Sequence, residues 1–294
     1  MIATVTLNPS VDVVLTAPRL NVGAVNRASA ETMYPGGKGV NVSIMAHRLG
    51  MDTLALGFIA GPMGHALRGM VQAEGVREDF ITLGKGQTRV NVKIPSLQGT
   101  EINGPGPAID THSYEKLVEQ LDRLKKPDML VLSGAIPPSL PADTYAEIAE
   151  FMASKGVETV VDCEGPALRQ ALDKHPFLIK PNVAELGQLY SQMLMTETDI
   201  VKCAQRAQDE GARNVLVSRG PDGAILLMES GEAYACEVTP GTLVNAVGAG
   251  DSMVAAFLAQ WCTTQDLESA LDFSVAVACA TAYSPWLASV ETLT

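Results

Sequence analysis

The chain has 294 residues, of which 47% are apolar and 18% are charged, a composition typical of a globular protein with a large core. Its net charge of −12 disfavours nucleic acid and anionic membranes as partners. An anionic ligand would need local cations and backbone N–H groups. The five scattered cysteines form no C-x-x-C pair, and the N-terminus does not have the pattern of a signal peptide. We therefore expect a cytoplasmic protein without a disulfide framework or a membrane span.

The first third of the chain is rich in strand patterns. Residues 2–7 alternate like a strand, and so do short stretches within 11–35 and 85–105. The glycine break before Lys38 opens a helical pattern over 38–49. We expect the segments 11–35 and 85–105 to form a small sheet over the open end of the core, where it could act as a lid that excludes water.

From about Thr111 predicted strands alternate with predicted helices, which is typical of βαβ units with a parallel sheet. The sequence thus predicts a single α/β domain over 1–294, with helices on both faces of a mostly parallel central sheet. A hairpin is expected around Ser230-Gly231. The expected helices are 113–125, 142–154, 166–172, 199–210, 249–261 and 267–283, and the strands between them are 129–132, 158–161, 177–179 and 214–217.

Small residues precede a helix in the segment NAVGAGDS at 245–252. Gly248, Ala249 and Gly250 would let a phosphate approach the free N–H groups of the helix start, where the helix dipole favours negative charge. Asp251 would then lie in the first turn and could accept a hydroxyl proton while those N–H groups hold the phosphoryl group. The alternative is that Asp251 only caps the helix.

A second glycine-rich helix start is YPGGKGVN at 34–41. Gly36 and Gly37 would expose backbone N–H groups, and Lys38 and Asn41 add donors for hydroxyls or phosphate. The alternative is a simple glycine turn into a helix.

Three charged residues of the β-rich segments are further candidates. Asp12 follows the first strand and could hold two sugar hydroxyls, unless it belongs to a turn. Arg27 and Arg89 could each pair with a phosphate in two hydrogen bonds, or could be ordinary surface arginines.

Two turns that follow strands have polar residues suited to a nucleotide and its metal. In KPNVAE, Asn182 and Glu185 could act on Mg²⁺ through water, because Mg²⁺ keeps much of its hydration shell, or could form a helix cap. The turn SRGPDG suits nucleotide phosphates or a hairpin. The candidate nucleotide contacts are Lys180, Asn182, Ser218, Gly220 and Gly223.

Other common nucleotide and hydrolase motifs are missing from the sequence. It has no Walker A loop, no G-x-G-x-x-G dinucleotide fingerprint, no H-E-x-x-H and no G-x-S-x-G. The missing fingerprint makes an oxidoreductase a distant alternative.

Taken together, the segments resemble the PfkB (ribokinase-like) sugar kinases over almost the whole chain. GGKGVN and VGAGDS are similar to the two family signatures, and KPNVAE is similar to the N-x-x-E motif. The resemblance implies a ribokinase-like fold, ATP and Mg²⁺ as cofactors, Asp251 as the base and the segment Gly248–Gly250 as the anion hole. Arg27, Arg89 and Lys38 would form a clamp on the substrate's own phosphate.

Within the family the chain is most similar to bacterial 1-phosphofructokinases, through segments such as TLNPSVD, TRVNVKI and SGAIPPSLP. The last of these adds Ser133 to the substrate contacts. The expected reaction converts fructose 1-phosphate to fructose 1,6-bisphosphate. The alternatives are a tagatose-6-phosphate or fructose-6-phosphate kinase and, in a different class, a non-catalytic sugar-phosphate sensor. The edge of the lid sheet could also be covered by a second subunit in a homodimer.

Overall fold

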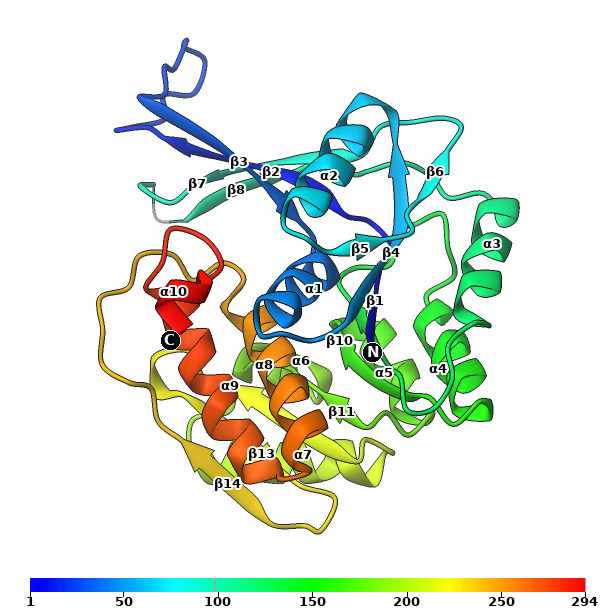
Figure 1. Cartoon of the computed structure of the whole chain (residues 1–294). Coiled ribbons are helices and arrows are strands. Elements are labelled where there is room, and N and C mark those ends of the chain that lie inside the picture. Colours follow the sequence, from blue (N-terminus) through cyan, green and yellow to red (C-terminus); the bar gives the residue numbers. More distant parts are fainter. Residues whose placement is uncertain (98, 294) are drawn as a thin grey trace.

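A ten-stranded, mostly parallel sheet forms the centre of the molecule (Figure 1). The computed structural model describes residues 1–97 and 99–293. The strand order is β14-β13-β12-β11-β10-β9-β1-β4-β5, with β6 beside β4, and only the pairs β12–β13 and β13–β14 are antiparallel. The strands are β1 (Ile2–Thr6), β4 (Thr53–Ala60), β5 (Arg77–Glu78), β6 (Ile81–Leu83), β9 (Met129–Ser133), β10 (Glu158–Asp162), β11 (Leu178–Ile179), β12 (Asn214–Ser218), β13 (Ala224–Leu227) and β14 (Ala233–Cys236).

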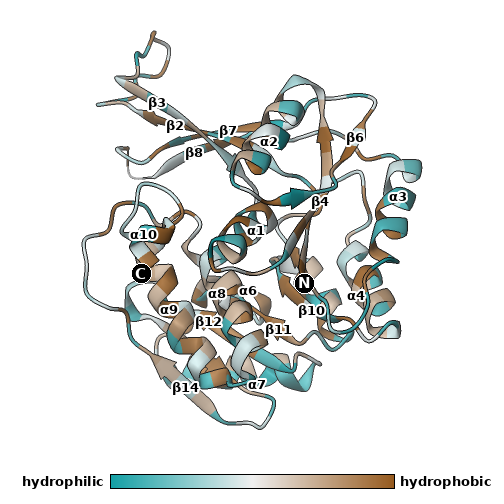
Figure 2. Cartoon of the chain, in the orientation of Figure 1, coloured by the Kyte–Doolittle hydropathy of each residue, from teal (hydrophilic) through white to brown (hydrophobic). Residues whose placement is uncertain are grey.

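Helices cover both faces of this sheet, because side chains alternate along each strand. In β1, Ala3 and Val5 belong to one buried cluster, whereas Ile2 belongs to the other. The first cluster packs against α3 (Thr111–Leu121), α4 (Thr144–Ser154), α5 (Gly165–Leu172), α6 (Val183–Leu189) and α7 (Glu197–Asp209). The second packs against α1 (Lys38–Arg48), α2 (Gly61–Ala73), α8 (Ala249–Thr264) and α9 (Leu267–Ala282). Figure 2 shows hydrophobic strands in the centre and hydrophilic residues on helices such as α3 and α7, whereas α8 and α9 are mostly hydrophobic. The predicted α/β architecture is confirmed.

The alternation of strands and helices in the central sheet begins earlier in the chain than the sequence predicted. The central strand β4 and the helix α2 precede Thr111, in a region that the pattern analysis left unassigned. Several glycines interrupt this region, and one of them is required by packing. A Cβ at Gly57, which has φ of 146°, would lie 2.1 Å from the carbonyl oxygen of Thr6 in the neighbouring strand.

A second, four-stranded sheet forms the lid, in the order β3-β2-β7-β8. Its strands are β2 (Ser10–Thr16), β3 (Ala30–Gly36), β7 (Arg89–Ile94) and β8 (Thr100–Asn103). The pair β2–β7 is parallel and the other two pairs are antiparallel. The segments 11–35 and 85–105 therefore form the small sheet that the sequence predicted. Arg27, however, lies outside the strands, in the connection between β2 and β3.

The chain closes with the short helix α10 (Val290–Leu293), which lies below the lid sheet (Figure 1). Trp286, just before it, stacks on Tyr34 of β3 with ring centroids 4.8 Å apart. Arg48 of α1 donates to the carbonyl oxygens of Leu287 and Ala288 at 2.9 Å, so lid, α1 and C-terminal segment contact one another. Within the described residues, no helix combines the length and the apolar character that a membrane crossing requires.

Candidate active site

The carboxyl ends of the parallel strands meet the first turns of α1 and α8 at one edge of the sheet. Because the strands are parallel, Thr6, Ser133, Asp162 and Ser218, which end four of them, lie along this same edge. Ligands in open α/β sheets bind at this edge. A Cβ at Gly39 in α1 would lie 2.5 Å from Thr6 Oγ1 and 2.9 Å from Ser133 Oγ, so α1 begins directly against the strand ends.

Asp251 lies in the first turn of α8, where the sequence placed it, and is buried with 7% of its surface exposed. Asn41 Nδ2 donates to Asp251 Oδ2 at 2.7 Å, which brings the two glycine-rich motifs together. Burial, and then the negative charge of Asp162, raise the pKa of Asp251 to about 6, against the Asn41 hydrogen bond and the Lys38 and Lys180 charges. The carboxylate is thus ionised at neutral pH and close enough to its pKa to accept a proton.

The residues before Asp251 form the predicted glycine-rich helix start. Gly248 is the N-cap of α8 and has a left-handed conformation with φ of 83°, which a residue with a side chain rarely adopts. A Cβ at Gly250 would lie 3.3 Å from Lys180 Nζ, so the missing side chain leaves that ammonium group against the helix start. The first N–H groups of α8 have no partner within the helix; Ala249 N donates to the Ala246 carbonyl oxygen at 3.3 Å, and the groups that follow it can donate to an anion.

A carboxylate that the sequence analysis did not single out lies beside these groups. Asp162, at the end of β10, accepts from Lys38 Nζ at 3.0 Å and lies 3.5 Å from Lys180 Nζ. Burial opposes ionisation of Asp162, but Lys180 and Lys38 hold its pKa below the ordinary value. Although burial opposes its charge too, Lys38 has a raised pKa because Asp162 stabilises the ammonium form.

Asp12 of β2 belongs to the lid side of the site and is buried. Ser10 Oγ and Asn91 Nδ2 donate to its Oδ1 at 2.7 and 3.0 Å, and Lys93 Nζ lies 3.1 Å from its Oδ2. A Cβ at Gly36 would lie 2.4 Å from Asp12 Oδ1, so only glycine allows this close approach. The sequence did not indicate a role for Lys93, because Lys93 is one of the side chains that alternate regularly along β7.

The two candidate phosphate-binding arginines lie in different places. Arg89 begins β7 and donates from Nε to the Asn8 carbonyl oxygen at 3.0 Å. Burial lowers the pKa of Arg89, and the Asp12 carboxylate opposes this effect. Arg27 is exposed, beyond the far end of the β2–β3 pair. The strands extend roughly 20 Å from the end at Ser10 and Gly36 to the end at Thr16 and Ala30. The structure therefore does not bring Arg27 together with Arg89 of the same chain.

Buried polar atoms without a hydrogen-bond partner in the protein gather around this edge. Buried polar groups in folded proteins nearly always have partners, so such a group of atoms indicates a polar ligand site. The atoms are Thr6 Oγ1, Asn8 Oδ1, Asn41 Oδ1, Asn91 Oδ1, Ser133 Oγ and Asp162 Oδ2.

Comparison with known proteins identifies the family. The sequence profile of the pfkB family of carbohydrate kinases matches residues 5–289. The chain belongs to this family. It is similar to a 1-phosphofructokinase from Bacillus subtilis, with 41% identity over 99% of this chain and 95% of that protein. It is also similar to a D-tagatose-1-phosphate kinase from Bacillus licheniformis, with 34% identity over 100% of this chain and 96% of that one.

The fold agrees with this assignment. Phosphofructokinase-2 from Escherichia coli, solved in complex with substrates and products, superposes with a TM-score of 0.91 at 29% identity, over 99% of this chain and 96% of that one. The chain is therefore a phosphotransferase that acts on an alcohol group of a carbohydrate, and ATP is the phosphoryl donor that kinases of this family use.

The candidate nucleotide residues of this pfkB kinase lie at the same sheet edge. Asn182 forms an isolated parallel bridge with Ser218, and Ser218 N donates to the Pro181 carbonyl oxygen at 3.1 Å. Gly220 begins a 3-10 turn, and Gly223 follows it, after β12. Lys180, just past β11, is 5% exposed, so the strand ends hold its ammonium group in place.

The candidate magnesium residues Asn182 and Glu185 already bond each other. They form a capping box at the start of α6, in which Glu185 N donates to Asn182 Oδ1 at 2.8 Å and Asn182 N donates to Glu185 Oε2 at 2.9 Å. No cluster of three metal-binding side chains occurs within residues 1–97 and 99–293. The structure thus shows the helix cap that the sequence offered as the alternative, and a role of Asn182 and Glu185 toward Mg²⁺ stays a prediction.

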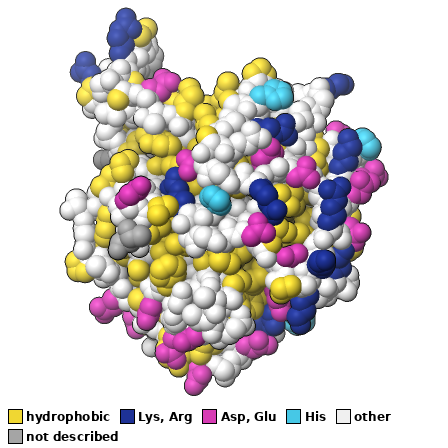
Figure 3. All heavy atoms as spheres, viewed as in Figure 1, with side chains coloured by type: hydrophobic (Ala, Val, Ile, Leu, Met, Phe, Trp, Pro, Cys, Tyr) yellow, Lys and Arg dark blue, Asp and Glu magenta, His cyan; other side chains and the backbone are white. Residues whose placement is uncertain are grey.

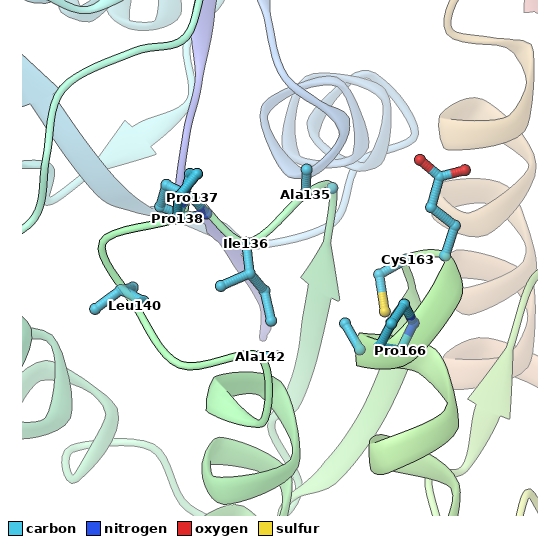
Figure 4. Close-up of a pocket in the computed structure, with 11 residues that line it drawn as sticks. Ala135, Ile136, Pro137, Pro138, Leu140, Ala142, Cys163 and Pro166 are labelled. Atoms are coloured by element: carbon cyan, nitrogen blue, oxygen red, sulfur yellow. The ribbon is translucent and has the colours of Figure 1, made fainter.

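A cavity of about 290 Å³ lies beside the site, between the connections β9–α4 and β10–α5 (Figure 4). Its labelled walls are mainly apolar: Ala135, Ile136, Pro137, Pro138, Leu140, Ala142, Cys163 and Pro166. None of the predicted site residues lines it. An apolar wall does not stabilise a phosphate group, so this cavity provides no phosphate-binding side chain of the kind that the sequence predicted.

Proposed function

We propose that this pfkB kinase transfers the γ-phosphoryl group of ATP to the free primary hydroxyl of fructose 1-phosphate, which yields fructose 1,6-bisphosphate and ADP. The observation that carries the proposal is the position of Asp251: a buried carboxylate with a pKa of about 6, in the first turn of α8 and bonded to Asn41. The 41% identity with a 1-phosphofructokinase supports the choice of sugar.

In this reaction Asp251 takes the proton of the hydroxyl as its oxygen bonds to the γ-phosphorus. The bond from that phosphorus to the β–γ bridging oxygen breaks, and ADP leaves. The N–H groups at Gly248–Gly250 stabilise the charge on the transferring group. The polar side chains of Asp12, Asn41 and Ser133, together with the backbone at Gly36 and Gly37, orient the sugar. Asn182 and Glu185 would hold a hydrated Mg²⁺ through water, and that ion would supply positive charge against the nucleotide phosphates.

The substrate's own phosphate would be bound on the lid side by Arg89. The sequence grouped Lys38 with the arginines, but its ammonium group lies with Lys180 on Asp162, on the Asp251 side. Nucleotide phosphates would lie along Ser218, Gly220 and Gly223, with Lys180 near the γ-phosphoryl group.

The lid favours a homodimer in which Arg27 completes the site of the other subunit. Figure 3 shows hydrophobic side chains on the projecting lid, with basic side chains at its tip. Among them, Val22 and Val25 are 97% and 81% exposed, and Met33 and Ile102 on the strands are also exposed. An exposed apolar sheet of this kind typically pairs with another surface. We infer that a second copy covers this surface and that Arg27, which lies beyond the end of the β2–β3 pair that is roughly 20 Å from Ser10 and Gly36 of its own chain, contacts the partner's phosphosugar.

The proposal is tested by incubating the protein with ATP, Mg²⁺ and fructose 1-phosphate, and following both ADP and fructose 1,6-bisphosphate. Equal amounts of the two products are expected. A non-catalytic sensor would bind fructose 1-phosphate in calorimetry and release no ADP, and this outcome would refute the enzymatic function. The intact anion hole and the partnered Asp251 argue against the sensor.

A further inference from the structure

Asp162, Lys38 and Lys180 form an ion cluster from three separate elements, in which Asp162 and Lys180 are buried and Lys38 is half-buried. Asp162 ends β10, Lys38 begins α1 and Lys180 follows β11. Both ammonium groups lie on the same oxygen, Asp162 Oδ1, at 3.0 and 3.5 Å. Asp162 is 1% exposed and its Oδ2 has no partner in the protein. A buried carboxylate is costly unless it is paired, so this cluster fixes both lysines.

The cluster has two positive charges and one negative charge, so its net charge is positive. This net charge lies on the side of the site where we propose that the phosphoryl group transfers. Lys180 Nζ lies against Gly250 of the anion hole, because a Cβ there would be 3.3 Å away. Lys38 follows Gly37 and begins the helix that contributes Asn41, the partner of Asp251. We propose that Asp162 is a positioning residue. It holds the Lys38 and Lys180 ammonium groups where they contact the phosphoryl group during its transfer. This inference rests on the proposed function.

Positioning matters because charge stabilisation in phosphoryl transfer depends on groups that are already in place. A lysine side chain has about 2 kcal/mol of rotamer entropy, so without an anchor its ammonium group would spread over many positions. The single carboxylate anchors both side chains, and its negative charge raises the pKa of Lys38. Without Asp162, ground-state binding would be retained through the other contacts, while the transition state would lose two fixed cations.

Asp162 also acts on the base. The charged groups that act on Asp251 are Asp162, Lys38 and Lys180, and Glu185 acts in turn on Lys38. Burial raises the pKa of Asp251 most, and the Asp162 carboxylate raises it further. Removing the Asp162 charge must therefore lower the pKa of Asp251 and move the acid limb of the pH–rate profile to lower pH. Because the Asp162 charge acts on Asp251 directly, a shift of this limb tests the electrostatic coupling, whereas the loss of kcat at pH values above the limb tests the positioning of the two lysines.

The test compares Asp162→Asn with the wild type and with Asp52→Asn. Asp52 also pairs with a cation, Arg77 at 3.1 Å, but is 63% exposed and lies at the amino end of β4, opposite the site. Asp162→Asn should lower kcat at least about tenfold, change both KM values less than about threefold, and shift the acid limb downward. Asp162→Glu, which keeps the carboxylate, should recover part of kcat, and Asp52→Asn should behave as wild type.

A double-mutant cycle with Lys38→Met separates positioning from stability. Asp162→Asn should reduce kcat less in the Lys38→Met background than in wild type, because one of the two cations that it holds is already gone. If Asp162→Asn does not fold, Asp162→Ser is used for the same test. If neither variant folds, Asp162 contributes to stability alone, and the proposal is overturned. An active wild type with an unchanged Asp162→Asn variant refutes only this inference, whereas a wild type without ADP release refutes the proposed function itself.

Discussion

Replacing Asp251 with asparagine removes the proposed base and little else. The amide has almost the same shape as the carboxylate, and its oxygen can still accept the hydrogen bond from Asn41 Nδ2, which spans 2.7 Å in the wild type. The change also removes a buried charge, so the free energy of unfolding should not fall. We therefore expect Asp251→Asn to fold normally and to bind ATP and the phosphosugar nearly as well as wild type.

The loss should appear in kcat. Proton transfer to a positioned base is worth about 10²–10⁴-fold, or roughly 3–5 kcal/mol of transition-state stabilisation. Because burial raises the pKa of Asp251 to about 6, the carboxylate is the dominant form at pH 7 and the minor form at pH 5. The base must be ionised to act. The titration of Asp251 alone should therefore lower wild-type kcat/KM as pH decreases through about 6, by roughly tenfold between pH 7 and pH 5.

The assay follows ADP release from pH 5 to pH 8 for both proteins, with calorimetric titrations of each substrate. The substrate's own phosphate also titrates near pH 6, with a second pKa of about 6. The Asp251→Asn variant separates the titration of Asp251 from that of the substrate phosphate. The pH dependence of its residual activity should come from the substrate alone. A variant with kcat within about tenfold of wild type, or with the same acid limb, would refute the assignment of Asp251 as base.

The remaining predictions concern the lid side of the site. Arg89→Ala should raise KM for the phosphosugar at least about tenfold with kcat nearly unchanged, since a hydrogen bond to a charged group contributes about 1.5–3 kcal/mol. Arg123→Ala, an exposed arginine paired with Asp79 at 3.8 Å, is the matched control, and an unchanged KM would remove Arg89 from the phosphate site. Val22→Asp should convert a dimer to monomers in light scattering and raise KM in parallel with Arg27→Ala. A fully active wild-type monomer would rule out the shared site.

The sequence predicted the site's two helix starts because their conformations depend on local residues. Gly37 and Gly248 both have left-handed φ values, of 111° and 83°, directly before α1 and α8. A glycine is the expected residue at such positions, so the pattern alone located both starts. The alternation of strands with helices after Thr111 was equally local, and the placement of helices on both faces of the sheet followed from it.

The features of the fold and the site that the sequence did not reveal depend on tertiary contacts. Asp162 at the end of a strand is an ordinary residue until the fold brings Lys38, 124 positions away, to 3.0 Å from it. The only available signal was a carboxylate at the carboxyl end of a buried strand. Arg27 was grouped with Arg89 because both lie in β-rich segments, but strand length separates them. Strand β4 and helix α2 were missed because glycines required by packing, such as Gly57, obscure the hydrophobic period.

The acceptor that we propose for this site is fructose 1-phosphate. Comparison of kcat/KM at saturating ATP for fructose 1-phosphate, tagatose 1-phosphate, tagatose 6-phosphate and fructose 6-phosphate tests this choice. We predict that fructose 1-phosphate exceeds each of the others by at least about tenfold, since polar groups fixed around a sugar discriminate strongly against a misplaced hydroxyl or phosphate. A higher value for any of the other three would contradict the account.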